Sequence, residues 1–170
     1  MTQVYVIVDC EGINVLEHTM REFGAVELSS LKSFYGKDAS RATFYHFEKW
    51  LEQFKGRKVF VSDNPAYDWQ GINYGFLHQL GRNPFGHSAR RVGDFYAGLK
   101  GNWRNTSGWK NLRKTPHTHN PVDDARGNAE ALREILGVNK GAGQLPALNA
   151  GDAMQEFLFP RTDNEGGFEK

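Results

Sequence analysis

The chain has little of several features on which large classes of proteins depend. Its 170 residues include one cysteine, Cys10, which excludes an intramolecular disulfide and fits a reducing compartment. No apolar run approaches the roughly 20 residues needed to span a bilayer. The first residues, "MTQVYVIVDCEG", lack the basic segment and the cleavage site of a secretion signal. These absences predict a soluble, cytoplasmic protein with no membrane partner.

A formal net charge of +1 hides an uneven distribution of charge. Between positions 82 and 114, eight Lys or Arg residues stand against one Asp, and Trp103 and Trp109 lie among Gly, Asn and Ser. Such a segment can hold a phosphate backbone, with Arg104 and Lys110 as contacts, while aromatic faces stack on bases. The alternative is a solvated loop with two core tryptophans. From this segment alone the choice stays open.

What is present is enough patterned apolar sequence for one core. A chain of this length buries about two thirds of its unfolded surface, and β-branched runs alternate with segments of helical spacing. Strands are expected at 3–9, 22–31, 57–63 and 89–96, and helices at 42–54, 68–81 and from Pro121 to before Gly137. This order, ββαβαβ and then α, with a hairpin between the first two strands, predicts an α/β domain over 1–137. The segment 138–170 is expected to be a partly ordered tail, or to pack on the domain or on a partner.

Capping residues set two helix boundaries. Gly56 is expected to end the first helix. Asn120 can cap the last helix ahead of Pro121, because proline is favoured in a first turn. The apolar stripe of this helix comprises Ala125, Ala129, Leu132, Ile135 and Leu136. The boundary at Asn120 places Asp124 in the first turn.

Acidic residues follow two of the expected strands. In "VDCEG", Asp9 and Glu11 are two residues apart, so both side chains point to one face of the strand end. Unless solvent covers them, two such carboxylates need a cation, and oxygen ligands suit Mg²⁺ or Mn²⁺ better than zinc. Asp68 begins the second helix, past the end of the third strand, where sites in open α/β sheets form. Asp63 is the rival there, but it is more typical of a turn that ends a strand.

These motifs together resemble a known family. "VDCEG" with "EFGAVEL", then "NPAYDW", "RVGDFYAGL" and "HNPVDDA" are similar, in this order over residues 4–136, to the DEDD superfamily of 3′-to-5′ exonucleases, which includes ribonuclease T, oligoribonuclease and polymerase proofreading subunits. Because His119 stands five residues before Asp124, the chain resembles the histidine-bearing subgroup, DEDDh. The resemblance implies an α/β fold with a ribonuclease-H-like mixed β-sheet flanked by α-helices.

The resemblance also implies a role for each motif residue. Two Mg²⁺ or Mn²⁺ ions, about 4 Å apart, would stabilise the attacking and leaving oxygens at phosphorus. Their ligands would be Asp9, Glu11, Asp68 and Asp124. His119 would be the general base, since an imidazole exchanges protons near neutral pH. His117 and Asp123 have the wrong spacing for these roles and are assigned to the surroundings or the surface.

Substrate contacts follow from the same resemblance. The backbone at Gly12 and Ile13 would receive the 3′-terminal nucleotide, and glycine permits a close approach. Asn64 and Trp69 flank Asp68 in an N-x-x-x-D-W arrangement and are assigned to substrate binding. Phe23 and Phe34 are weaker candidates for base stacking, because each fits the core better.

The sequence thus predicts a metal-dependent 3′-to-5′ exonuclease that hydrolyses single-stranded nucleic acid to nucleoside 5′-monophosphates. RNA is favoured over DNA, because the chain resembles compact exoribonucleases, with few residues between Glu11 and Asp68. Two alternatives stay open: a two-metal nucleotide phosphohydrolase, and a catalytically silent nucleic-acid-binding module of the same fold. Four converging carboxylates would repel phosphate in a silent module, which favours an enzyme. A homodimer is a further open alternative.

Overall fold

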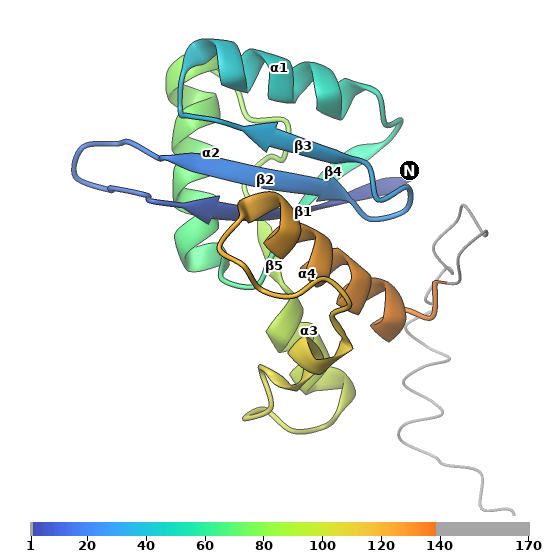
Figure 1. Ribbon diagram of the computed structural model, residues 1–170. Coiled ribbons are helices and arrows are strands. Elements are labelled where there is room, and N and C mark those ends of the chain that lie inside the picture. The colour runs from blue at the N-terminus through green and yellow to red at the C-terminus, as the bar shows by residue number, and fades with distance from the viewer. Residues whose placement is uncertain (1, 139–170) are drawn as a thin grey trace, which may run out of the picture.

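A computed structural model describes residues 2–138 as a mixed five-stranded sheet with helices on both faces (Figure 1). The strands are β1 (Gln3–Glu11), β2 (Glu22–Glu27), β3 (Ser33–Gly36), β4 (Arg57–Ser62) and β5 (Ala89–Arg91). Their order across the sheet is β3-β2-β1-β4-β5. Strand β2 runs antiparallel to both of its neighbours, β1 and β3, whereas β4 pairs parallel with β1 and β5 pairs parallel with β4. This is the mixed α/β sheet that the resemblance implied.

The helices divide between the two faces of the sheet (Figure 1). One face is covered by α1 (Arg41–Glu52) and α2 (Pro65–Leu80), and the other by α4 (Pro121–Ile135). The short helix α3 (Val92–Leu99) and the 3₁₀ turn η1 (Gly108–Leu112) contribute to the α4 side. Within residues 2–138, each helix is too short or too polar to cross a lipid bilayer.

Strand β1 faces both layers because its side chains alternate. Val6, Val8 and Cys10 are buried against α1 and α2, whereas Ile7 is buried under α4. The α1 and α2 side is built from aromatic rings that pack in contact. Phe47 lies at the centre of this cluster, with its ring centroid 5.0 Å from Phe23 and 5.4 Å from Phe76.

The structure corrects several predicted boundaries. The predicted strand 89–96 is a strand only at Ala89–Arg91, and Val92–Leu99 forms α3. The four residues of β3 were not predicted, because a strand this short at the sheet edge shows little alternation. Strand β2 stops at Glu27, whose carboxylate accepts hydrogen bonds from the N–H groups of Ser29 and Ser30 and so stabilises a turn.

The predicted helix ends also shift. Helix α1 ends at Glu52, with Gln53 as its C-cap, so Gly56 does not end it as predicted. Instead Gly56, at φ +134°, lets the chain pass close to the carbonyl of Thr2. Helix α2 begins at Pro65, earlier than predicted, and ends at Gly81 as expected. The tail predicted from position 138 onward lies, apart from Val138, outside the described residues.

Candidate active site

The end of β1 carries the first two acids on the α4 side of the sheet. Since Cys10 is buried against α1 and α2, its neighbours Asp9 and Glu11 point to the other face. Asp9 lies opposite Gly24 of β2. A Cβ at Gly24 would collide with the backbone carbonyl of Pro121, so this glycine lets the N-terminus of α4 lie over the two strands.

Helix α2 brings Asp68 to the same end of the sheet. Asp68 lies in the first turn and is 2% exposed. Its Oδ1 accepts a hydrogen bond from the backbone N–H of Cys10 (3.0 Å), and its Oδ2 accepts one from the hydroxyl of Ser62. Burial raises the pKa of Asp68 to about 7, although these hydrogen bonds act in the opposite direction. The carboxylate is therefore held in a fixed orientation beside β1.

Helix α4 supplies Asp124, which is fully buried in its first turn as predicted. Its two oxygens accept hydrogen bonds from the backbone N–H groups of Thr118 (3.0 Å) and His119 (3.1 Å). Asn120 caps the helix, since its side chain accepts hydrogen bonds from two N–H groups of the first turn. The cap and the preceding loop together fix the position of Asp124.

Acids from three elements converge at this point. One oxygen each of Asp9, Glu11 and Asp124 lies within 4.8 Å of the others. Burial, followed by the charges of Asp68 and Asp124, raises the pKa of Asp9 to about 8. The structure thus brings three of the four carboxylates that the sequence motifs singled out within ligand distance of one another, and Asp68 lies near enough to raise the pKa of Asp9 by its charge.

Two observations fit this cluster to a divalent cation. Asp9 Oδ2 is buried and has no hydrogen-bond partner among the described residues, although a buried acceptor normally has one. The converging donors are carboxylate oxygens, the ligands that suit Mg²⁺ and Mn²⁺. Without a cation, like charges at this separation repel one another, an effect that adds to burial in raising the pKa of Asp9.

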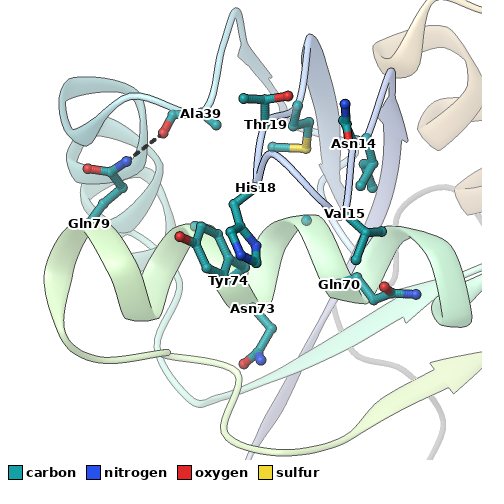
Figure 2. A pocket seen from close by; sticks show the side chains of 13 residues that line it. Asn14, Val15, His18, Thr19, Ala39, Gln70, Asn73, Tyr74 and Gln79 are labelled. Carbon is teal, nitrogen blue, oxygen red and sulfur yellow. Dashed lines mark hydrogen bonds between the residues drawn. The ribbon is translucent and has the colours of Figure 1, made fainter.

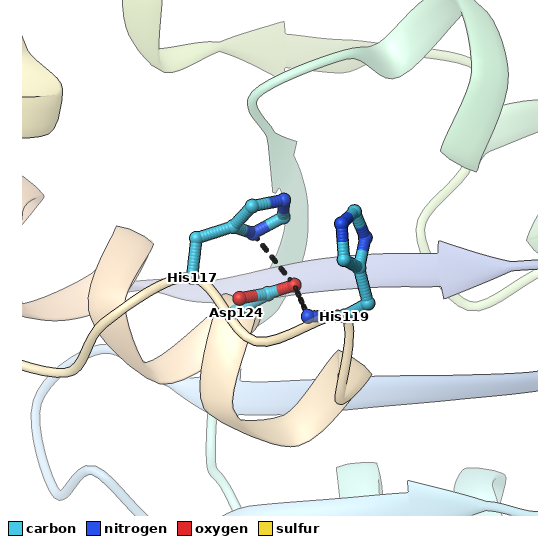
Figure 3. A group of neighbouring side chains, drawn as sticks. All are labelled: His117, His119 and Asp124. Carbon is cyan, nitrogen blue, oxygen red and sulfur yellow. Dashed lines mark hydrogen bonds and ion pairs between the residues drawn. The ribbon is translucent and has the colours of Figure 1, made fainter.

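Two histidines border the cluster (Figure 3). His119 Nδ1 lies 3.7 Å from Glu11 Oε1, its side chain is 76% exposed, and its backbone φ is +60°, in the left-handed region. His117 Nδ1 lies closer, 2.7 Å from Asp124 Oδ2. The two imidazole rings meet edge to face, with their centroids 4.4 Å apart. His117, which its spacing assigned to the surroundings or the surface, thus contacts the carboxylate of Asp124 and is half exposed.

The predicted contacts around Asp68 divide into surface and core. Asn64 is exposed at the start of α2, whereas Trp69 packs edge-on against Phe60 in the core (5.1 Å between ring centroids). The rival acid Asp63 makes an ion pair with Lys110 (2.9 Å) instead of joining the cluster. Trp69 therefore packs against the core.

The backbone after Glu11 lies open beside the cluster. Gly12 has a φ of +65° and is exposed. The N–H of Ile13 donates a hydrogen bond to the hydroxyl of Tyr67 (2.9 Å), a residue that the sequence analysis did not single out. Phe23 is fully buried and Phe34 packs against Phe47, so the weaker stacking candidates are core residues.

The basic segment combines features of both interpretations that the sequence left open. Trp109 is 1% exposed and packs under α4, so it is a core residue, whereas Trp103 is 81% exposed. Arg113 lies over the Trp109 ring and donates a hydrogen bond to Asn128. Arg104, next to Trp103, is exposed, as are Lys100, Lys110 and Lys114, so this segment presents a basic outer surface around Trp103.

Comparison with known proteins gives one partial similarity. No family model matches the chain. Over 82 residues the chain is 38% identical to the 3′-5′ DNA exonuclease Cap18 of Escherichia coli. The match covers 45% of this chain and 44% of that protein, less than half the length of either.

Proposed function

We propose that the protein is a metal-dependent 3′-to-5′ exonuclease that removes nucleotides from single-stranded nucleic acid as nucleoside 5′-monophosphates. The observation that carries the proposal is the convergence of Asp9, Glu11 and Asp124 at the end of β1, with the charge of Asp68 close by and one buried oxygen of Asp9 unpaired among the described residues. The partial similarity to a 3′-5′ DNA exonuclease supports the same class of reaction. The order of the motifs along the chain supports it as well.

In this proposal the cluster holds two Mg²⁺ or Mn²⁺ ions through Asp9, Glu11, Asp68 and Asp124. Such ions, when bound, stabilise the charge on the attacking and leaving oxygens of an in-line displacement at phosphorus. The protein supplies rigid ligands for them. Asp68 and Asp124 are oriented by backbone N–H groups, and a carboxylate held in this way needs little rearrangement when it binds a cation.

His119 is assigned the general base. It accepts a proton from the attacking water, whose oxygen forms the new bond to phosphorus, while the bond from phosphorus to the 3′ oxygen of the preceding nucleotide breaks. The ring is exposed, and the backbone N–H of His119 is anchored to Asp124, so the imidazole can turn without moving the loop. His117, in contact with Asp124, is assigned a positioning role.

Substrate contacts are proposed on both sides of the cluster. The 3′-terminal nucleotide would lie against the exposed backbone at Gly12 and the adjoining Ile13. Asn64, Trp69 and the basic residues Arg104 and Lys110 are the further contacts carried over from the sequence. Arg104 is exposed, whereas Lys110 would have to exchange its ion pair with Asp63 for a phosphate.

The two lines of support for the proposal favour different sugars in the substrate. The resemblance to compact exoribonucleases favours RNA, whereas the partially similar Escherichia coli protein is named for DNA. Since that name describes a protein with measurable identity to this chain, DNA is the substrate to test first. The proposal itself requires only a single-stranded 3′ end, of DNA or of RNA.

The test uses oligonucleotides of one sequence, made as DNA and as RNA, labelled at the 5′ end and incubated with the full chain and Mg²⁺. The proposal predicts a ladder that shortens from the 3′ end, release of nucleoside 5′-monophosphates, and no reaction in chelator. A 3′ phosphate should slow the first step. Internal cleavage at the same rate on blocked and free ends would contradict it. Hydrolysis of free nucleotides alone would support the phosphohydrolase alternative instead.

A further inference from the structure

A pocket of about 230 Å³ lies between the loop that joins β1 to β2 and one face of α2 (Figure 2). The loop is closed by paired backbone hydrogen bonds between Asn14 and Thr19 (2.9 and 3.1 Å). A Cβ at Gly71 would come within 2.9 Å of Ile13 Cδ1, so this glycine lets the loop lie directly against the helix. Pockets that bury drug-sized ligands measure roughly 300 to 1,000 Å³. This pocket therefore suits a smaller group.

Parallel rings form one wall of the pocket (Figure 2). The imidazole of His18 stacks on the ring of Tyr74, with centroids 4.2 Å apart and planes 9° from parallel, and Tyr74 stacks in turn on His78. His18 is exposed and has a φ of +53°, a left-handed conformation that is strained for a non-glycine residue. The strained backbone holds a flat ring at the surface, and flat rings at surfaces bind bases by stacking.

Apart from the imidazole of His18, the polar side chains that line the pocket are amides and hydroxyls. No Lys, Arg, Asp or Glu is among the described residues that line it. Asn73 Oδ1 accepts a hydrogen bond from Asn83, which leaves the Asn73 amide nitrogen as a donor without a partner in the described chain. The Gln79 amide donates to the carbonyl of Ala39, which leaves its oxygen as an acceptor. A neutral aromatic ligand with polar edges matches this wall better than a phosphate does.

The pocket is lined by residues that follow the acid cluster closely along the chain. Ile13 and Asn14, which line it, follow Glu11 directly along the chain after Gly12. Tyr67, whose hydroxyl accepts the N–H of Ile13, immediately precedes Asp68. Along α2, Tyr74 lies six residues beyond Asp68, a distance of about 9 Å at the rise of an α-helix. A nucleotide strand with a phosphate at the acids can therefore extend a neighbouring base into the pocket.

From these observations we infer that the pocket between the β1–β2 loop and α2 binds one nucleobase of the substrate strand near its 3′ end, by stacking on His18 and by hydrogen bonding to Asn73. This inference rests on the proposed function, because it takes a nucleic-acid strand as the ligand. His18 is a binding residue in this account, and Asn73 sets a preference among bases.

The test measures binding in chelator, so that no strand is hydrolysed. Single-stranded oligonucleotides carry either 2-aminopurine or an abasic site at each of the last four positions. The inference predicts quenched 2-aminopurine fluorescence at one position, and binding about 5- to 150-fold weaker when that position is abasic, the range given by one stacked base. His18→Ala should lose the quenching and bind the intact strand as weakly as the native protein binds the abasic one. His46→Ala, at an exposed histidine on α1, should change neither result.

The outcomes separate this inference from the proposed function. If strands are hydrolysed in Mg²⁺ but no position is quenched, or if His18→Ala binds like the native protein at unchanged melting temperature, the pocket inference is wrong and the proposed function stands. If quenching is seen and lost in His18→Ala but no strand is hydrolysed, the pocket stands and the proposed function fails. Quenching that a free nucleoside 5′-monophosphate abolishes more readily than an unlabelled strand would assign the pocket to the product and overturn the inference. Asn73→Ala should equalise binding of the four bases at the quenched position.

Discussion

The two faces of the sheet use one strand for opposite purposes. Toward α1 and α2, the side chains of β1 join a cluster of aromatic rings in which Phe47 contacts several others, an arrangement that stabilises the fold. Toward α4, the same strand ends in Asp9 and Glu11, which meet Asp68 and Asp124 and carry charges that repel one another. Side-chain alternation lets adjacent residues serve stability and chemistry separately, so changes on the two faces should have separable effects.

The largest expected effect is a loss of activity when the acidic residues on the α4 side of the sheet, here called the acid face, are changed. Asp9→Asn or Asp68→Asn should lower turnover by on the order of 10³-fold or more, since a metal ligand contributes several kcal/mol to the transition state. The melting temperature should stay equal or rise, because one repelling charge is removed. The measurement pairs end-labelled digestion with a thermal melt. A large fall in melting temperature would mean that these acids are structural.

His119→Ala should have the next largest effect on turnover. Loss of a general base typically lowers the rate by roughly 10²- to 10⁴-fold, and binding of Mn²⁺ should be nearly unchanged because His119 is not a proposed ligand. His117→Ala is the matched comparison, and a smaller loss of turnover is expected there. Equal losses in the two variants would remove the distinction between base and positioning residue.

On the α1 and α2 side of the sheet, here called the aromatic face, Phe47→Ala should lower the stability of the fold instead of the activity. Removing a fully buried phenylalanine costs about 3–5 kcal/mol, which lowers the melting temperature of a chain of this size by roughly 10 °C. Turnover per folded molecule at low temperature should match that of the native protein. If turnover per folded molecule falls as much as in Asp9→Asn, the two faces are not separable.

The stability of the fold should depend on pH in the direction set by the raised pKa values of Asp9 and Asp68. In the folded chain the pKa of Asp9 is raised to about 8 and that of Asp68 to about 7, from an ordinary value of 3.8. The folded state therefore holds protons that the unfolded state has lost, so stability should fall as pH rises from about 4 to about 8 in chelator. Saturating Mg²⁺ should reduce this fall, and so should Asp9→Asn. A melting temperature that rises over this range would contradict the pKa shifts.

The smallest expected effect is on salt dependence. Arg104 and Lys114 are exposed in the basic segment, so Arg104→Gln with Lys114→Gln should weaken strand binding. The slope of affinity against salt should fall by roughly 0.7 for each lost phosphate contact. Lys49→Gln, on α1, is the control and should leave the slope unchanged. A change in turnover without a change in slope would remove the basic segment from the binding surface.

Local signals in the sequence predicted the acids and the helix that carries Asp124. Asp9 and Glu11 are separated by the period of a strand, and the Asn120 cap acts within the first turn of its own helix. In contrast, the burial of Trp109 and the path of the loop that brings His117 to Asp124 depend on residues outside their own sequence neighbourhood. Glu130 holds the loop before His117 by accepting the N–H groups of Lys114 and Thr115. Such contacts produce no repeating pattern in the sequence from which they could be predicted.

Helix α3 is a different kind of miss, because a signal was present. Its buried residues Gly93 and Ala97 are four positions apart, as on one face of a helix, but Val92, Phe95 and Tyr96 are residue types enriched in strands, and the two glycines lower the helix propensity. Burial of these positions beside α4 outweighed the local preference.

A calorimetric titration of Mn²⁺ into the metal-free protein tests the central claim most directly, because it needs no substrate. The account predicts saturable binding of two ions in the native protein and in a variant with one aromatic-face change, such as Phe47→Leu. In Asp9→Asn, at least one of the two ions should be lost. No saturable binding to the native protein, or the same stoichiometry and affinity in Asp9→Asn, would contradict the claim that the acid face is a metal centre.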